Sequence, residues 1–238
     1  MQKNTYPGKF TPHLSIDNKN QPLRDWFISV GGKPILPRRK GAGFIVFEGL
    51  DGSGQSTQSK LLAQYLTEQG RPVVLTKEPT LDSQAGKKIR EILDEKTVIE
   101  PAKLQELFVE DRREHLKNLI IPALKEGKIV ISDRYFFSTL AYGAIDLDLE
   151  WLIKINDEFL LPDIILILAV KPETAIERIK NRGDEIKLFE KQEKLEKVWR
   201  TYQILSQRFS DVYMINGEKS IKDVHSDILK IIKDKFSF

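Results

Sequence analysis

Short apolar runs rich in β-branched residues recur along the chain, and segments with helical periodicity separate them. The runs occupy residues 44–47, 73–75, 129–131, 164–170 and 212–215. Strands that alternate with helices are typical of a parallel sheet with helices on both faces. The pattern therefore predicts an α/β fold, a doubly wound parallel sheet of about five strands.

The helical segments are marked by apolar stripes and by helix-ending residues. The stripe of the first helix consists of Leu61, Leu62, Tyr65 and Leu66. Gly70 then stands where a left-handed C-terminal cap belongs. A longer helix is expected over about residues 102–126, bent or interrupted near Pro122 and ended by Gly127. Another is expected over residues 148–160.

The first part of the chain has a different composition. Residues 1–42 are polar and rich in proline, with one candidate hairpin at 26–30 and 33–36. We expect an N-terminal extension of unassigned role, either a surface appendage or an arm that contacts a partner or a second subunit. Residues 43–238 are expected to form the domain. Within it, residues 180–192 carry dense charges of both signs and are expected to form a mobile lid, with a solvated helix as the alternative.

Composition narrows the function classes. The 238 residues are 40% apolar, enough for the core of one domain, and the net charge is only +3 although 31% of residues are charged. We therefore expect no nucleic-acid partner. The absence of cysteine excludes disulfides, thiolate catalysis and cysteine-ligated zinc. The longest apolar run is far below the about 20 residues of a membrane helix, so no membrane partner is expected and the chain fits a cytoplasmic protein.

One segment between the first strand and the first helix has the glycine pattern of a phosphate-binding loop. It consists of Gly49, Leu50, Asp51, Gly52, Ser53, Gly54, Gln55 and Ser56, with Thr57 following. Backbone N–H groups and the positive end of the next helix attract the β- and γ-phosphates of a nucleotide such as ATP. The usual pattern is G-x-x-x-x-G-K-[ST], and Gln55 stands at the lysine position. The alternative is an ordinary strand-to-helix turn.

Two further pairs of residues could act on a nucleotide. Asp133 and Arg134 follow the strand at 128–132, at the sheet edge where open α/β folds bind ligands. Asp133 could hold Mg²⁺ directly or through water, with Ser56 as a hydroxyl ligand, and Arg134 could clamp a phosphate. The alternative is a structural salt bridge. Phe108 and Arg112 lie one helical turn apart and could meet one planar base, unless Phe108 is a core residue.

From Phe44 to its C-terminus the chain resembles the thymidylate kinases, P-loop nucleoside monophosphate kinases that move the γ-phosphoryl of ATP onto dTMP. The matching segments are FIVFEGLDGSGQSTQ (44–58), TKEPT (76–80), LFVEDRREH (107–115), SDRYFFSTLAY (132–142), PDIILILAVKPETAIERI (162–179) and FEKQEKLEKVWRTY (189–202). The first 40 or so residues lie outside the resemblance.

The resemblance implies an acceptor site for dTMP. Phe108 would stack on thymine, Arg112 would bond its carbonyl edge, and Arg134 would grip the phosphate. Tyr142 matches an aromatic residue that crowds the ribose 2′ position, and Asp51 one that contacts the sugar or the water shell of the metal. The other residues expected to contact dTMP are Glu78, Pro79, Ser138 and Thr139.

It also implies a donor site for Mg²⁺-ATP and a homodimer. Arg178 matches a residue on the adenine side, and Arg182 matches one in the lid. Lys77 supplies positive charge beside the turn formed by Glu78 and Pro79. The residues expected to carry catalysis are Gln55, Arg134, Asp133, Lys77 and Arg182.

Three positions depart from the family pattern. Gln55 removes a positive charge that meets the transferring phosphoryl, a loss that can cost on the order of 10² to 10³ in rate unless Lys187, Arg182 or Lys77 compensates for it. Leu188 stands where many relatives carry a lid arginine, and Ala169 replaces a common aspartate.

These departures leave two alternatives to dTMP phosphorylation. The chain could be a kinase for another nucleoside or deoxynucleoside monophosphate. It could also be a non-catalytic nucleotide-binding regulator that lost activity with the loop lysine.

Overall fold

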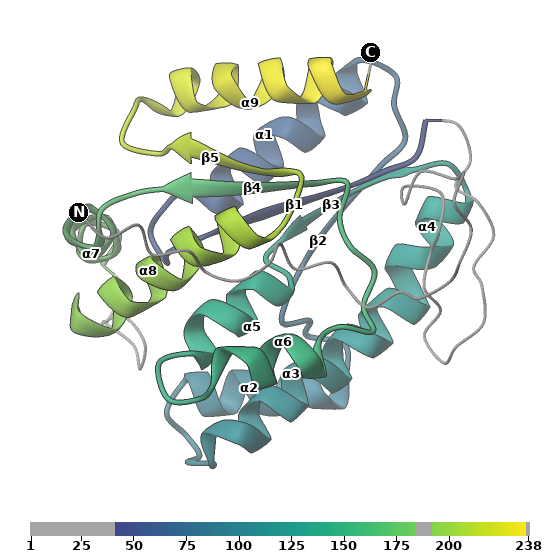
Figure 1. Ribbon diagram of the computed structural model, residues 1–238. Helices are drawn as coiled ribbons and strands as arrows, with labels where there is room; N and C mark the ends of the chain where they lie inside the picture. Colours follow the sequence, from purple (N-terminus) through teal and green to yellow (C-terminus); the bar gives the residue numbers. More distant parts are fainter. Residues whose placement is uncertain (1–40, 184–191, 237–238) are drawn as a thin grey trace.

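Five parallel strands form the centre of the molecule (Figure 1). The computed structural model describes residues 41–183 and 192–236. The strands are β1 (Gly43–Gly49), β2 (Val73–Lys77), β3 (Ile129–Asp133), β4 (Ile164–Ala169) and β5 (Val212–Asn216). They lie in the order β2-β3-β1-β4-β5, and every neighbouring pair is parallel. The prediction of a five-stranded, doubly wound parallel sheet is confirmed.

Helices cover both faces of this sheet (Figure 1). They are α1 (Gln55–Glu68), α2 (Gln84–Leu93), α3 (Pro101–His115), the π-helical segment η2 (Leu116–Ile120), α4 (Ile121–Lys125), α5 (Phe136–Gly143), α6 (Leu149–Ile155), α7 (Pro172–Asn181), α8 (Gln192–Arg208) and α9 (Ile221–Phe236). The helices α1 and α9 pack on one face, and α5, α6 and α8 pack on the other.

Two separate cores result from the alternation of side chains along the central strand β1. Phe44 and Val46 point into the core beneath α5 and α8, whereas Ile45 and Phe47 point into the core beneath α1 and α9. Because the helix after β1 and the helix after β3 cover opposite faces, a crevice opens between the carboxyl ends of these two strands. Glu48 continues the alternation and enters the core on the α5 side, where a carboxyl group is unusual.

Some of the observed helix ends agree with the ends predicted from the sequence, and one does not. Gly70 has a left-handed backbone (φ 73°) after α1, as expected. The predicted long helix is interrupted by the π-helical η2, which ends just before Pro122, a residue that cannot donate the next helical hydrogen bond. The prediction of a helix to residue 160 is wrong, since α6 ends at Ile155. The Asn156 side chain there bonds back to the Leu152 carbonyl (2.8 Å).

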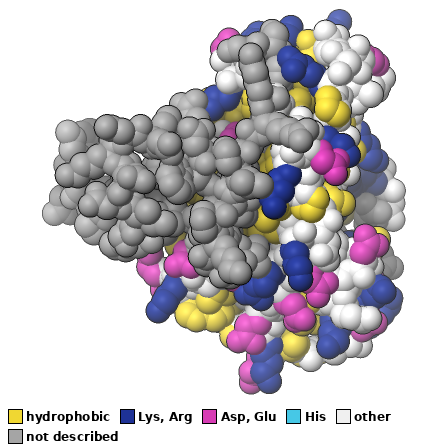
Figure 2. Space-filling model, turned by 90° about the vertical axis from the view of Figure 1, so that its right-hand side faces the viewer, with side chains coloured by type: hydrophobic (Ala, Val, Ile, Leu, Met, Phe, Trp, Pro, Cys, Tyr) yellow, Lys and Arg dark blue, Asp and Glu magenta, His cyan; other side chains and the backbone are white. Residues whose placement is uncertain are grey.

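Two predictions concern residues outside the described ones. These are the candidate hairpin at 26–36 and most of the candidate lid at 180–192. Among the described helices, none has the length and apolar character needed to cross a bilayer. On the face shown in Figure 2, basic and acidic side chains are interspersed. This mixture accords with the small net charge.

The buried carboxylate of Asp111 on α3 fixes the segment that leads from β2 into α2. It accepts hydrogen bonds from the Thr80 amide (2.8 Å) and from the hydroxyls of Thr80 and Ser83 (2.5 Å each). Ser83 in turn caps α2 by accepting from the Gly86 amide (2.7 Å). A β-carbon on Gly86 would lie 2.1 Å from the Thr80 carbonyl oxygen, so only glycine fits there.

We therefore expect Gly86→Ala to lower the free energy of unfolding by roughly 3 kcal/mol, because the added methyl group forces two backbone segments apart. Gly70→Ala is the control, since a β-carbon there has no neighbour within 4 Å and costs only the left-handed strain of about 1 kcal/mol. Urea unfolding of both variants measures the difference. A smaller loss for Gly86→Ala than for Gly70→Ala would contradict the close approach.

Candidate active site

The loop between β1 and α1 is shaped by glycines with positive φ. Gly52 (φ 84°) lies so close to α7 that a β-carbon would be 2.4 Å from the Ala175 carbonyl oxygen. Gly54 (φ 100°) precedes α1, and no side chain caps the first turn of that helix. The backbone N–H groups at this helix start are thus available to an anion. The structure confirms that the glycine segment opens a helix.

Gln55 is turned inward. Its side-chain amide donates a hydrogen bond to the Gly49 carbonyl (3.1 Å), and the residue is only 5% exposed. The amide therefore closes the loop on its own backbone. Ser56 and Thr57, by contrast, face solvent at the start of α1.

Three polar side chains meet at the ends of β2 and β3. In the sheet register Asp133 pairs with Phe47 of β1 on one side and with Lys77 of β2 on the other. One oxygen of the Asp133 carboxylate accepts from the Lys77 ammonium (3.1 Å) and from the Ser56 hydroxyl. The predicted metal ligands, Ser56 and Asp133, are thus in contact with each other.

The geometry around Asp133 fits a magnesium ion. Its other oxygen, Oδ1, is buried and has no hydrogen-bond partner among the described residues, and the same holds for the Ser53 hydroxyl inside the loop. Buried polar atoms without partners are uncommon, and a carboxylate and a hydroxyl are hard oxygen ligands of the kind that Mg²⁺ prefers. The residues present therefore suit Mg²⁺ with its bound waters.

Arg134 lies behind the loop with a left-handed backbone (φ 77°). Its guanidinium donates to the Asp51 carboxylate (2.7 Å), the Gly49 carbonyl (3.1 Å) and the Ser138 hydroxyl (2.9 Å). Burial alone would raise the pKa of Asp51, but the charge of Arg134 and the Tyr142 hydroxyl outweigh this effect and lower it. Asp51 is thus ionised, and Arg134 is held in place between the loop and α5.

A cavity opens between this loop, α2, α3 and α5. Every residue that the sequence analysis assigned to dTMP lines it, and Lys77 lines it too. Phe108 is half-buried: it lines the cavity and also packs against the apolar residues between α2 and α3. The structure thus brings the expected acceptor residues together, while their contacts with a nucleotide stay a prediction.

The floor of the cavity is a buried ion pair. Arg112, 1% exposed, pairs with Glu78 (2.8 Å). It also donates to the side chains of Asn156 (2.6 Å) and Thr139 (2.8 Å). The second Glu78 oxygen contacts His115 (3.0 Å). Three of the five guanidinium N–H donors are satisfied by these hydrogen bonds, so the Arg112 side chain is held in a fixed position.

Sequence reasoning missed several residues of this cavity. Arg90 and Leu93 come from α2, Gln105 from α3 and Tyr135 from the start of α5. Among the described residues Arg90 has no side-chain partner, although it carries a full charge into the cavity. The strongly amphipathic segment 84–93 could have revealed α2, but nothing local shows which of its charged residues turns inward.

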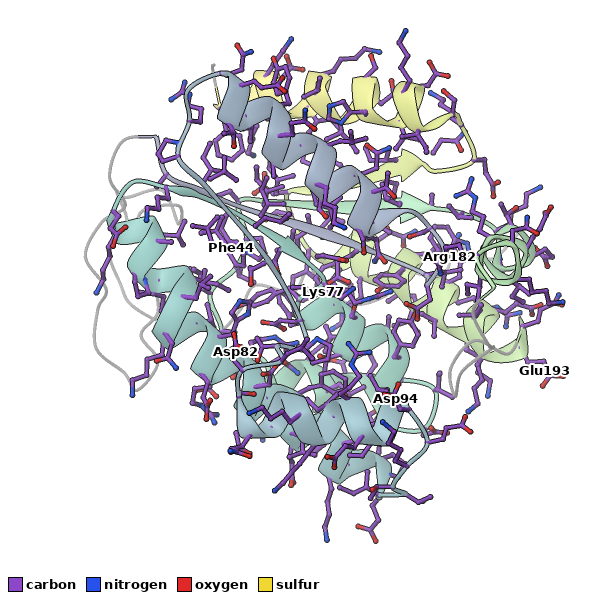
Figure 3. The ribbon with its side chains drawn as sticks, turned by 180° about the vertical axis from the view of Figure 1, so that it is seen from behind. Phe44, Lys77, Asp82, Asp94, Arg182 and Glu193 are labelled. Carbon is purple, nitrogen blue, oxygen red and sulfur yellow. The ribbon has the colours of Figure 1, made fainter. Side chains whose placement is uncertain are left out.

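Other predicted residues lie elsewhere around the loop. Arg178 donates to the backbone carbonyls of Ser53 (3.5 Å) and Gly217 (3.0 Å), so it lines the outer side of the loop. Arg182 follows α7 and lies well apart from Lys77 (Figure 3). Lys187 and Leu188 fall outside the described residues. Ala169 ends β4, where its carbonyl accepts from the Gly217 amide (2.9 Å).

Glu48 is a further buried group that the sequence analysis did not single out. Its carboxyl accepts from the amides of Tyr135 (2.9 Å) and Ser138 (3.2 Å), and from the hydroxyls of Ser138 (2.5 Å) and Tyr202 (3.0 Å). Ser138 also bonds Arg134, so Glu48 supports the arginine through one intermediate. Burial raises the pKa of Glu48 to about 7.

A glycine loop between a central strand and a helix, with an Asp-Arg pair at the end of the adjacent strand, defines the class of P-loop phosphate-binding α/β proteins. The family model described as Thymidylate kinase matches residues 47–228. The chain therefore belongs to the thymidylate kinase family.

Individual relatives agree with this assignment. The chain is 45% identical over 196 residues to a probable thymidylate kinase of Pyrococcus horikoshii, an alignment that covers 80% of this chain and 95% of the relative. It is 42% identical over 191 residues to a thymidylate kinase of Desulfotalea psychrophila, covering 79% and 93%. The crystal structure of thymidylate kinase from Ehrlichia chaffeensis superposes with a TM-score of 0.65 at 30% identity, covering 81% of this chain and 99% of that one.

The buried Glu48 predicts a pH dependence of stability. Because its folded-state pKa lies above the ordinary value of 4.5, the folded protein binds more protons than the unfolded chain between pH 4.5 and about 7. The stability that Glu48 contributes is thus complete below pH 4.5 and is lost as the pH rises through about 7.

We expect the free energy of unfolding to fall by up to about 3 kcal/mol from about pH 5 to about pH 8 relative to the Glu48→Gln variant, which cannot ionise. Urea titrations of both proteins at a series of pH values provide the comparison. Parallel pH profiles for wild type and variant would refute the raised pKa.

Proposed function

We propose that this protein transfers the γ-phosphoryl group of ATP to dTMP, giving ADP and dTDP. Membership of the thymidylate kinase family supports the reaction, and one observation of the structure carries it. The phosphate loop and the cavity with the acceptor residues share Asp51 and Arg134 at their boundary. Two anionic ligands bound on either side of these residues would meet head to tail.

The residues divide into a donor side and an acceptor side. The loop backbone and the start of α1 would bind the ATP phosphates, with Arg178 behind the loop. In the acceptor cavity Phe108 would stack on thymine, and Arg112 and Thr139, already bonded to each other, would meet its polar edge. Tyr142, whose hydroxyl donates to Asp51 (2.9 Å), would stand beside the sugar.

Phosphoryl transfer needs little covalent help, so positioning and charge carry the catalysis. Arg134 is suited to the acceptor phosphate, because it lines the cavity and Asp51 and Ser138 fix the position of its guanidinium. Ser56 and Asp133 would hold Mg²⁺, whose positive charge would offset the negative charge of the donor phosphates. The lid, the homodimer and the cytoplasmic location stay predictions.

The two alternatives are less well supported. A kinase for another nucleoside monophosphate would not need all of the residues expected to contact dTMP to line one cavity. A regulator without activity would not need an aspartate with a free buried oxygen beside the loop. The names of the relatives point the same way.

We expect purified protein with Mg²⁺-ATP to convert dTMP to dTDP in preference to dUMP, dCMP, dGMP and dAMP. Phe108→Ala should raise the KM for dTMP about tenfold, because stacking on one base is worth about 1–3 kcal/mol, while the KM for ATP stays within about twofold. Coupled detection of ADP and chromatography of the products measure both. Equal turnover of another monophosphate would favour the rival kinase, and nucleotide binding without dTDP would favour the regulator.

A further inference from the structure

The phosphate loop lacks a cation of its own. From Gly49 to Thr57 it contains no lysine or arginine, and the Gln55 amide is bonded to the Gly49 carbonyl. The transferring phosphoryl carries negative charge that a P-loop lysine ordinarily meets. Either the site works without this charge, or another residue brings it.

Among the lysines that the structure describes, Lys77 lies beside both the metal-binding aspartate proposed for the donor side and the acceptor cavity. It is the last residue of β2, and in the sheet register it lies beside Asp133. Its ammonium is 3.1 Å from the Asp133 oxygen that also accepts from Ser56, at the first turn of α1. Lys77 also lines the acceptor cavity. The point between donor and acceptor phosphates is therefore within reach of its side chain.

The side chain of Lys77 is also free to move. It is 51% exposed and has one ion-pair partner, so two of its three N–H donors remain for phosphate oxygens. Arg134 is held by three protein partners, and Arg178 is bonded to carbonyls on the outer side of the loop. Arg182 lies far from Lys77 at the end of α7 (Figure 3).

We propose that Lys77, from the edge strand β2, takes the place of the missing loop lysine. This rests on the proposed function. In the transfer, a phosphate oxygen of dTMP bonds to the γ-phosphorus while the bond from that phosphorus to the β–γ bridging oxygen breaks, and its electron pair leaves with ADP. Lys77 moves no proton: its ammonium contacts the oxygens of the group in transit.

A cycle of four proteins tests the replacement: wild type, Lys77→Met, Gln55→Lys and the double variant. Lys77→Met should lower kcat by about 10² to 10³, the usual loss when one group that stabilises the transition-state charge is removed. Gln55→Lys places a lysine in the loop while Lys77 is still present, and its kcat is the reference for the double variant. In the double variant the new lysine should restore kcat at least about tenfold over Lys77→Met, a non-additive result expected only if both positions serve one role.

Binding gives a second readout that needs no turnover. The affinity for a non-hydrolysable ATP analogue should fall about tenfold in Lys77→Met, while the affinity for ADP changes less than about twofold, because ADP lacks the γ-phosphate. Lys60→Met is the matched control, because Lys60 is an exposed lysine on α1 that does not line the cavity, and it should match wild type in both assays. Lys77→Arg keeps the charge and should retain about a tenth of kcat or more.

The outcomes separate this inference from the proposed function. If wild type makes no dTDP, the proposed function fails. The loss of affinity for the ATP analogue in Lys77→Met, compared with the loss for ADP, still decides whether Lys77 contacts the γ-phosphate. If wild type is active and Lys77→Met equals it, Lys77 is not the replacement. A loss in Lys77→Met that Gln55→Lys does not restore, or equal losses of affinity for both nucleotides, also overturns the proposal.

Discussion

The site depends on the parallel register of the three strands β1, β2 and β3. Phe47, Asp133 and Lys77 form one row across the sheet. Because of this register, the loop after β1, the Asp-Arg pair at the end of β3 and the end of β2 lie next to one another. Side chains in one row of a parallel sheet point to the same face, which brings Asp133 and Lys77 to the side where α1 begins. A slip of one residue would turn them to the opposite face and separate them from Ser56.

The buried ion pair of Arg112 and Glu78 gives the cavity its floor. It joins α3 to the end of β2, and through Asn156 and Thr139 it extends to α6 and α5. Because desolvation offsets much of the attraction, such a pair adds little net stability, yet removing one partner is costly. The main effect of the ion pair is therefore to fix the orientation of Arg112 before any ligand binds. The loss of side-chain entropy on binding is then small.

The sequence correctly predicted those features of the fold that depend on residues close together in the chain. The five strands, the helix-opening loop and the cap at Gly70 follow from side-chain alternation and glycine positions. The inward turn of Gln55 did not follow, because it depends on where the Gly49 carbonyl points. Glu48 was missed because its partners come from α5 and α8, far along the chain. The early end of α6 at Asn156 likewise reflects a bond to Arg112 that no local signal contains.

The position of a cation in the sequence matters less than its distance from the phosphoryl group. At an effective dielectric constant near 20, two unit charges about 4 Å apart interact by about 4 kcal/mol, and doubling the distance halves this energy. A replacement cation must therefore come within a few ångströms, and most basic residues of the fold are excluded by that requirement. The proposal for Lys77 is consistent with this requirement, because Asp133, which lies 3.1 Å from its ammonium, also contacts Ser56 at the start of α1. The sheet register can thus supply from a neighbouring strand the charge that the loop no longer carries.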